Sequence, residues 1–361
     1  MALASIQKIT KIIPCPNSDF LEICTVLGWQ VVTKKDEYQV GDNCIYIQID
    51  TVCPSTEQFE FLRDRNFRVR TIKLRKQLSQ GLIIPLTDKM LISSTAKYLE
   101  GADVSEEIGI KKYEKPNNNP SREEKPRMPK IWYKKWIYLF KYNILYKAFP
   151  NLQPLSRSPF PSNLVSKTDE ERIQNIPQTL EKYKGEEFVV SYKMDGSSIT
   201  IIHNKVLGKS KYRICSRNFE LHDTKNEWYK TFVNTNFQVH IDNLVKHYNT
   251  NDIIVQGECI GNFNGNHHNL SKDEIRLFNI IVNGKRVNQI EFLQTCGLLH
   301  IPHCELFKYI VLNHSMDEIL KISEQPDILN PKVPLECLVW RNIEDNFSFK
   351  VINNNYALTE K

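Results

Sequence analysis

The stretch that most constrains the fold is a Lys-x-Asp-Gly tetrapeptide, Lys193 to Gly196, between apolar β-branched runs at residues 187–190 and 199–202. Such runs are typical of buried strands, and glycine permits a tight bend between them. The pattern predicts a strand that ends at Lys193, a turn through Gly196 and a second strand. A lysine held there becomes a nucleophile once its amine is neutral, and nearby cations, a metal ion or desolvation each lower a lysine pKa. The alternative is an ordinary surface turn, and the rest of the sequence must distinguish between these two interpretations.

The first hundred residues predict a small all-β barrel. Strand-like segments alternate with turn signals, and Ser55 marks the start of a polar helix over residues 55–65. Five short strands with one interposed helix favour an OB-like barrel. The predicted strands are residues 6–13, 21–32, 44–49, 67–74 and 82–86.

Two arginines of this region, Arg68 and Arg70, share one face of a predicted strand because side chains alternate along a strand. Adjacent guanidinium groups repel each other unless an anion lies between them. The sequence leaves two interpretations open: binding of nucleotide or nucleic-acid phosphate, or pairing with carboxylates from elsewhere in the fold.

The positive charge of the chain is concentrated in one segment. The net charge is +6, yet residues 111–150 contain eleven Lys/Arg and three Glu, a local balance of +8. A polyanion is the natural partner of such a segment. Residues 114–130 include four prolines and predict a linker, and residues 131–147 place Trp132, Trp136 and Leu139 at helical spacing among lysines. We favour a helix packed on a neighbouring domain; stacking on bases or lying on a membrane surface are the alternatives.

The cysteines indicate a reducing, intracellular location, either cytoplasmic or nuclear. Nine cysteines are scattered without a Cys-x-x-Cys pair, which argues against a disulfide framework or a zinc ribbon. His267 and His268 near Cys259 lack the four-ligand spacing of a zinc site and are predicted to lie in a loop. The N-terminus has no signal-peptide pattern, and no apolar run is long enough to span a membrane.

The remainder of the chain predicts an α+β domain with charged residues in or beside buried strands. A polar helix is predicted over residues 167–175, strands over 212–215, 253–258, 277–282, 335–341 and 347–352, and a hairpin at Asn283-Gly284. An unpaired buried charge is costly, so such residues pair or hold a ligand. Oxygen ligands suit Mg²⁺ or Mn²⁺, directly or through water. Three carboxylates and three basic groups therefore predict a phosphate-and-metal site: Asp195, Glu258, Glu336, Lys193, Arg217 and Lys350.

The order of these segments resembles motifs I, Ia, III, IIIa, IV and V of the covalent nucleotidyltransferases, which include RNA ligases, DNA ligases and mRNA capping enzymes. The matching segments are Lys193-Met-Asp195-Gly196, Ser216-Arg217-Asn, Gln-Gly-Glu258, Leu277-Phe278, Glu336-Cys337-Leu and Phe349-Lys350. Segments 26–35, 67–75 and 79–82 further resemble the Deinococcus-type nick-sealing RNA ligases. Those ligases carry an N-terminal OB domain and nothing after motif V, and this chain ends eleven residues after Lys350.

The resemblance implies three segments: an OB-like domain at 1–113, a basic linker with an aromatic helix at 114–150, and a nucleotidyltransferase domain of antiparallel sheets with flanking helices at 151–361. It implies a monomeric, ATP-dependent RNA ligase that acts on RNA ends or nicked duplexes with Mg²⁺ or Mn²⁺. Lys193 would attack the α-phosphorus of ATP and form a lysyl–AMP, AMP would pass to an RNA 5′-phosphate, and a 3′-OH would then expel it.

The resemblance also implies a role for each site residue. Asp195 would orient the ribose or a metal-bound water, and Glu258 and Glu336 would hold the hydration shell of the metal. Arg217 and Lys350 would contact AMP or its phosphate. Phe278 would stack on adenine. Arg172, Arg68 and Arg70 would contact the β- and γ-phosphates.

Three departures bear on the alternatives. Ser198 stands where DNA ligases and capping enzymes carry Arg, which favours an RNA ligase over a DNA ligase or a capping guanylyltransferase. Cys337 stands where Gly is usual, and it would be strained there if that Gly has a positive φ. Ile352 stands where Lys is common. The last two departures motivate another alternative, a nucleic-acid-binding protein with weakened catalysis.

Overall fold

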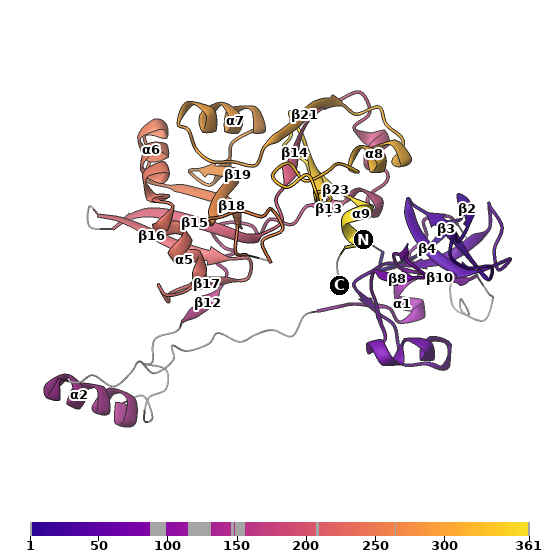
Figure 1. The fold of residues 1–361 in the computed structure, drawn as a ribbon, viewed down its shortest axis with the longest axis horizontal. Helices are drawn as coiled ribbons and strands as arrows, with labels where there is room; N and C mark the ends of the chain where they lie inside the picture. Colours follow the sequence, from indigo (N-terminus) through magenta and orange to yellow (C-terminus); the bar gives the residue numbers. More distant parts are fainter. Residues whose placement is uncertain are drawn as a thin grey trace.

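The computed structural model describes residues 2–86, 99–114, 131–145, 148, 156–206, 209–263 and 265–359. An N-terminal β-rich unit lies beside a larger α+β domain, and helix α2 (Trp132–Leu139) lies apart from both (Figure 1). The predicted domain limits at residues 113 and 150 stay predictions.

The N-terminal unit is built of small antiparallel sheets around two apolar clusters, one centred on Ile6 and Ile45 and the other on Trp29 and Tyr46. This confirms the predicted all-β unit. The predicted run 21–32 is a hairpin rather than one strand, because Leu27 and Gly28 take positive φ values of 52° and 80°. The elements are β1 (Ala4–Lys8), β2 (Lys11–Pro14), β3 (Leu21–Val26), β4 (Trp29–Lys34), β5 (Asn43–Ile47), β6 (Thr51–Val52), the 3-10 helix η1 (Glu57–Arg65), β7 (Arg68–Val69), β8 (Ile72–Leu74), β9 (Gln77–Ser79), β10 (Leu82–Pro85), α1 (Ser105–Ile108) and β11 (Lys111–Lys112).

The larger domain contains two sheets. The seven-stranded sheet has the order β12-β17-β16-β15-β18-β19-β20, and the five-stranded sheet has the order β13-β23-β22-β14-β21. Their pairings are antiparallel except for β13 with β23. The strands are β12 (Arg157–Pro159), β13 (Glu171–Arg172), β14 (Glu187–Lys193), β15 (Ser197–Val206), β16 (Lys209–Ser216), β17 (Phe219–Leu221), β18 (Ile253–Ile260), β19 (Glu274–Val282), β20 (Lys285–Arg286), β21 (Leu306–Val311), β22 (Cys337–Asn342) and β23 (Ser348–Ile352).

Helices cover one face of each sheet. Phe232, Leu244 and Phe292 from α5, α6 and α7 pack on the seven-stranded sheet, and Ile319 from α8 packs on the five-stranded sheet (Figure 1). The predicted antiparallel sheets with flanking helices are therefore confirmed. The helical elements are η2, a π-helical turn (Phe140–Leu145), η4, a 3-10 turn (Ile173–Asn175), α4 (Thr179–Lys182), α5 (Glu227–Asn234), α6 (Gln238–Tyr248), α7 (Gln289–Leu298), α8 (Met316–Ile322) and α9 (Asn354–Ala357).

The Lys-x-Asp-Gly turn is the point where the chain passes from one sheet to the other. Strand β14 lies in the five-stranded sheet and ends at Lys193, and β15 begins at Ser197 in the seven-stranded sheet. The predicted strand–turn–strand is thus confirmed, and the turn lies where the two sheets meet. Groups from β18 and from the segment leading into β22 can therefore reach the same lysine.

One predicted element is wrong. Residues 167–175 do not form a helix: Glu171 and Arg172 form β13, parallel to Phe349 and Lys350 of β23, and Ile173–Asn175 follow as a 3-10 turn. The polar composition suggested a helix, but backbone pairing with β23 determined the conformation. This pairing brings Arg172 beside Lys350.

The N-terminal unit contacts the larger domain through the β3–β4 turn. A Cβ at Gly28 would lie 2.6 Å from Cγ of Met316 in α8, so only glycine allows this approach. The Arg172 guanidinium lies over the ring of Trp29, 5.5 Å from its centroid. None of the described helices has the length and apolar character needed to cross a membrane.

Candidate active site

Lys193 is held by a carboxylate from a distant part of the chain. Its Nζ donates to both Oε1 and Oε2 of Glu336, each at 2.8 Å. The alignment of Lys193 with Cys337 across β14 and β22 brings the two groups together. Burial works to lower the pKa of Lys193, but the charges of Glu336 and Glu258 outweigh it and hold this pKa well above its ordinary value. The expected nucleophile is therefore a protonated cation paired with Glu336.

Glu258 on β18 lies in the same cluster of carboxylates. It is 8% exposed, and burial raises its pKa to about 7; Lys193 acts against this, while Glu336 and Asp195 add to it. A divalent cation would relieve this crowding, so the residues fit a metal. Among the described residues, no three His, Cys, Asp or Glu side chains are placed to hold one metal ion directly. A metal at Asp195, Glu258 and Glu336 held through water stays a prediction.

Gly196 is required by a close approach of backbones. A Cβ at this position would lie 2.2 Å from the carbonyl oxygen of Cys259 and 2.9 Å from Cγ of Glu258. Its φ does not lie in the left-handed region. The absence of a side chain therefore lets the turn approach β18, and this sets the separation between Lys193 and Glu258.

The predicted phosphate-binding cations, Arg217 and Lys350, share one carboxylate. Asp169 accepts from Nη2 of Arg217 at 2.7 Å and from Nζ of Lys350 at 3.1 Å. Two cations that share one carboxylate could bind a nucleotide phosphate in its place, which stays a prediction. The structure thus brings Arg217 and Lys350 together, as the resemblance implies.

Phe278 and Arg172 contact different parts of the structure. Phe278 is partly buried and packs with Met194, the residue that follows the nucleophile. Arg172 lies beside Lys350 in the β13–β23 pair and over Trp29 of the N-terminal unit. Stacking on adenine and binding of β- and γ-phosphates stay predictions for these two residues.

Arg68 and Arg70 belong to the N-terminal unit. Arg68 pairs with Asp50 at 2.5 Å and stacks on the Tyr113 ring, 3.6 Å from its centroid. Arg70 is exposed. Arg68 therefore already has a carboxylate partner, which is the second of the two interpretations left open by the sequence. Phosphate binding by this pair stays a prediction.

Cys337 is not strained. It has no positive φ, is fully buried within β22, and aligns with Lys193 on one side and Ile352 on the other. The condition under which Cys would be strained is not met, so this residue gives no support to weakened catalysis.

Restoring the usual glycine at this position is expected to harm the protein. Cys337→Gly removes a buried side chain and adds backbone freedom in a strand, so it should lower the free energy of unfolding by about 1–2 kcal/mol without speeding lysine adenylylation. Denaturant unfolding and a single-turnover adenylylation assay measure the two effects. Cys337→Ala, which keeps a Cβ, should cost less. Faster adenylylation in the glycine variant would contradict this account of Cys337.

The resemblance implies that Lys193 is adenylylated, and the rate of that reaction should rise with pH. Burial raises the pKa of Glu258 to about 7, so its carboxylate ionises as pH passes through that value. The raised pKa of Lys193 keeps its amine protonated at neutral pH, and its small neutral fraction grows as pH increases. The ionised Glu258 opposes loss of the Lys193 proton, so the direction of the pH dependence is set by the growing neutral fraction of the amine. Single-turnover rates between about pH 6 and pH 8.5 should therefore increase throughout; a maximum below pH 7 would be inconsistent with the site.

Several site residues were not predicted from the sequence. Asp169 bridges two of the cations, Tyr356 of α9 donates to Oδ2 of Asp195 at 2.8 Å, and His268 accepts from the backbone N–H of Asp195 at 3.0 Å. His268 was assigned only to a loop. The adjacent pair His267-His268 after the Glu258 strand was the one local signal available.

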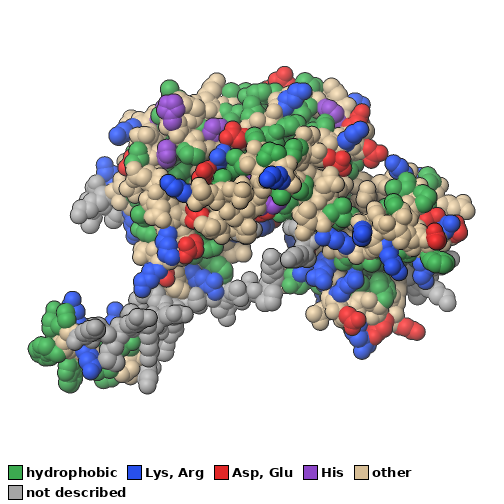
Figure 2. All heavy atoms as spheres, viewed as in Figure 1, with side chains coloured by type: hydrophobic (Ala, Val, Ile, Leu, Met, Phe, Trp, Pro, Cys, Tyr) green, Lys and Arg blue, Asp and Glu red, His purple; other side chains and the backbone are tan. Residues whose placement is uncertain are grey.

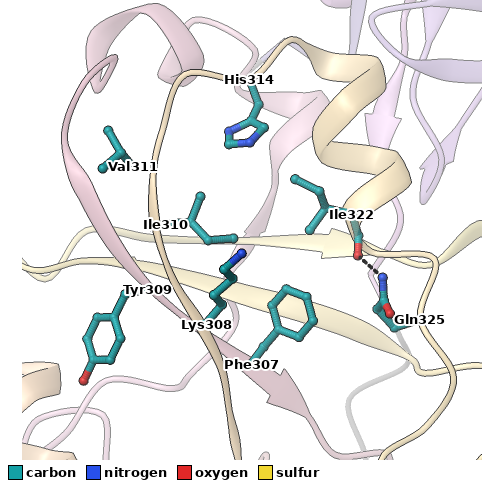
Figure 3. A pocket seen from close by; sticks show the side chains of 8 residues that line it. All are labelled: Phe307, Lys308, Tyr309, Ile310, Val311, His314, Ile322 and Gln325. Atoms are coloured by element: carbon teal, nitrogen blue, oxygen red, sulfur yellow. Dashed lines mark hydrogen bonds between the residues drawn. The ribbon is translucent and has the colours of Figure 1, made fainter.

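A cavity of about 360 Å³ at the edge strand β21 lies away from these groups. It is lined by Phe307, Lys308, Tyr309, Ile310, Val311, His314, Ile322 and Gln325, and Figure 3 shows Tyr309 and Val311 to one side of the other labelled side chains. None of the predicted site residues lines it. The candidate active site is therefore the Lys193 cluster and not this cavity.

Two family models match the chain, one in each of its two larger parts. Residues 3–86 match a family described as an OB-fold domain, and residues 186–352 match the family described as RNA ligase. No curated protein matches the chain in sequence. The narrower likeness to Deinococcus-type ligases stays a prediction.

Solved structures of Naegleria gruberi RNA ligase match over the whole chain. The form with PPi is 30% identical, covers 99% of this chain and 98% of that chain, and has a TM-score of 0.69. A lysine-to-alanine variant with ATP and Mn is 29% identical, with 99% of each chain covered and a TM-score of 0.71. A glutamate-to-alanine variant with AMP and Mn is 28% identical, covers 100% and 99%, and has a TM-score of 0.71. This full-length similarity, together with a ligase match that includes every motif from Lys193 to Lys350, shows that the chain belongs to the RNA ligase family.

Proposed function

We propose that this protein is an ATP-dependent RNA ligase that joins 3′-OH and 5′-phosphate ends through a lysyl–AMP on Lys193. The observation that carries the proposal is the position of the Lys193 amine at the junction of two sheets, between the carboxylates Glu336 and Glu258. Lys350 and Arg217, bridged by Asp169, supply cations for a phosphate. The relatives solved with ATP, AMP, PPi and Mn support ATP as co-substrate and a divalent metal.

In the first step, Nζ of Lys193 attacks the α-phosphorus of ATP. A P–N bond forms, the bond from the α-phosphorus to the bridging oxygen breaks, and pyrophosphate leaves. The amine must first lose its proton and separate from Glu336. Arg217 and Lys350 can exchange Asp169 for phosphate oxygens and stabilise the charge that develops there.

The next two steps transfer AMP and seal the ends. An oxygen of the RNA 5′-phosphate attacks the AMP phosphorus, the P–N bond breaks, and Lys193 recovers its amine. The 3′-OH then loses its proton, attacks the RNA phosphorus and expels AMP. A divalent metal, when bound through water at Asp195, Glu258 and Glu336, supplies positive charge that offsets these carboxylates. The expected substrate is a nick whose 3′-OH strand is RNA.

Labelled nucleotides test the proposal. Purified protein with Mg²⁺ or Mn²⁺ is incubated with labelled ATP, GTP or NAD⁺, and label on the protein is measured. We expect label from ATP alone and sealing of a nicked duplex with an RNA 3′-OH strand. Label from GTP would indicate capping chemistry, and sealing only with a DNA 3′-OH strand would indicate a DNA ligase. Nucleic-acid binding without label would indicate a protein that has lost catalysis.

A further inference from the structure

The segment from Ile131 to Leu145 presents an apolar surface that the two domains do not cover. Trp132 and Trp136 are 75% and 73% exposed, and none of the residues of α2 is buried. Trp132, Trp136 and Phe140 are four residues apart, so they line one side of the helix. The other exposed apolar residues of the segment are Ile131, Tyr133, Ile137 and Ile144, which are 47%, 48%, 62% and 59% exposed. The favoured packing of this helix on a neighbouring domain is therefore not seen.

The charge beside this surface is entirely positive. At 100° per residue, Lys134 and Lys135 lie on either side of the apolar face, and both are exposed. From residue 125 to residue 168 the sequence contains nine Lys/Arg and no Asp or Glu. Figure 2 shows hydrophobic and basic side chains, and no acidic ones, on the visible face of α2. The partner that fits is anionic on its surface and apolar beneath.

The apolar residues distinguish between two classes of polyanion. Bases of RNA stack on aromatic rings, but isoleucine offers no ring and no hydrogen bond. Ile131, Ile137 and Ile144 offer RNA neither ring stacking nor a hydrogen bond, whereas a lipid interface accepts aromatic and aliphatic side chains together and leaves lysines among the headgroups. We propose that the segment 131–145 docks this protein on an anionic lipid surface, with the helix lying in the plane of the interface.

Vesicle sedimentation of the full chain tests the proposal. Vesicles of phosphatidylcholine with phosphatidylserine are compared with vesicles of phosphatidylcholine alone. The wild type should sediment with the first and weakly with the second. Trp132→Ser combined with Trp136→Ser should weaken sedimentation by about tenfold or more, and Lys134→Glu combined with Lys135→Glu should remove the preference for phosphatidylserine. Phe20→Ser, at an equally exposed side chain of the N-terminal unit, should change nothing.

All these substitutions are at exposed positions, so each variant should fold and keep the adenylylation rate of the wild type. Absence of sedimentation with both vesicles would overturn the proposal. Loss of affinity for an RNA oligonucleotide in the tryptophan variant, without any lipid binding, would assign the surface to RNA. If light scattering detects a dimer of the wild type and none of the tryptophan variant, the apolar surface would be assigned to contact with a second copy of the chain.

A second inference concerns the loop after β18 and rests on the proposed function. Nε2 of His268 accepts from the backbone N–H of Asp195 at 3.0 Å, and its Nδ1 faces Oδ1 of Asp327 at 3.0 Å. The side chains of His268 and Asp327 are each 1% exposed. Because Nε2 accepts, the proton of the neutral ring must be on Nδ1, where it is donated to Asp327. Asp327 also accepts from the backbone N–H groups of Leu329 and Asn330.

We infer that His268 is a positioning residue: oriented by Asp327, it fixes the turn that carries Lys193 and Asp195. The contact is made to the backbone of the turn, so it sets the location of both side chains and takes no part in bond formation. A second contact holds the same residue, because Tyr356 donates to the Asp195 carboxylate.

His268→Phe keeps a ring of similar volume but removes the acceptor, and His268→Gln offers an oxygen close to the position of Nε2. The Phe variant should adenylylate about tenfold or more slowly at saturating ATP with little change in KM, and the Gln variant should recover most of the rate. Equal rates in the Phe variant and the wild type would overturn the inference. An equal loss of adenylylation rate in both variants, together with lowered melting temperatures, would show that His268 contributes only to packing.

Amide hydrogen exchange gives a readout that does not depend on activity. The Asp195 amide should exchange faster in His268→Phe than in the wild type. If the wild type forms no adenylate, the proposed function fails and the exchange result still decides the inference. Unchanged exchange at Asp195 would overturn it.

Discussion

Lys193→Ala is expected to abolish formation of the protein–AMP adduct. The side chain supplies the nitrogen that forms the P–N bond in the proposed first step, and alanine at the end of β14 has no amine to replace it. Intact-mass analysis of protein given ATP and Mg²⁺ or Mn²⁺ should show one added adenylyl group in the wild type and none in the variant. Lys184→Ala, at a lysine whose side chain is 60% exposed, is the matched control and should behave as the wild type.

Lys193→Ala also distinguishes the proposed first step from the proposed final step. An RNA that already carries a 5′-adenylate bypasses the lysine, because the final step joins a 3′-OH to that activated phosphate. Lys193→Ala should therefore still seal a nick with a pre-adenylated end. An adduct on Lys193→Ala protein, or none on wild type with any metal, would show that residue 193 is not the nucleophile.

Gly196→Ala is expected to be the most damaging small substitution in the turn. The added methyl group would lie 2.2 Å from the Cys259 carbonyl, a backbone atom that cannot move without disturbing β18. Moving the turn away from β18 to make room for the methyl group should cost about 1–3 kcal/mol of folding free energy. Displacement of Lys193 from Glu258 by about 1 Å should slow adenylylation on the order of 10²-fold. Thermal unfolding and single-turnover kinetics measure both effects.

Gly297→Ala is the matched control. Gly297 lies in α7, and a Cβ there meets no atom within 4 Å. Alanine in a helix is favoured over glycine, so this variant should be as active as the wild type and more stable by about 0.5–1 kcal/mol. Normal adenylylation kinetics in Gly196→Ala would show that the turn can accept a methyl group beside β18, and would contradict the role given to Gly196.

The local strands and turns were predictable because their signals lie within a few residues. Continuous apolar runs predicted β14, β15, β18 and β22, and Asn283-Gly284 predicted the hairpin between β19 and β20, where both residues take positive φ. The N-terminal run 21–32 was identified as strand, but its central Leu27-Gly28 turn was not recognised. The helix prediction for residues 167–175 is wrong because their local pattern is helical, whereas a partner strand far along the chain determines their conformation.

The sequence by itself determined which charged residues lie in or beside buried strands, and hence the members of the proposed catalytic set. Only the tertiary structure decided how they pair. Lys193 and Glu336 are 143 residues apart, and their contact depends on the alignment of β14 with β22. Asp169, His268 and Asp327 lie in loops. They join the site through hydrogen bonds to residues that are distant in the sequence. Local patterns encode strand and turn propensity, whereas the partner of a charge depends on sheet register and loop packing, which arise only when the whole domain has folded.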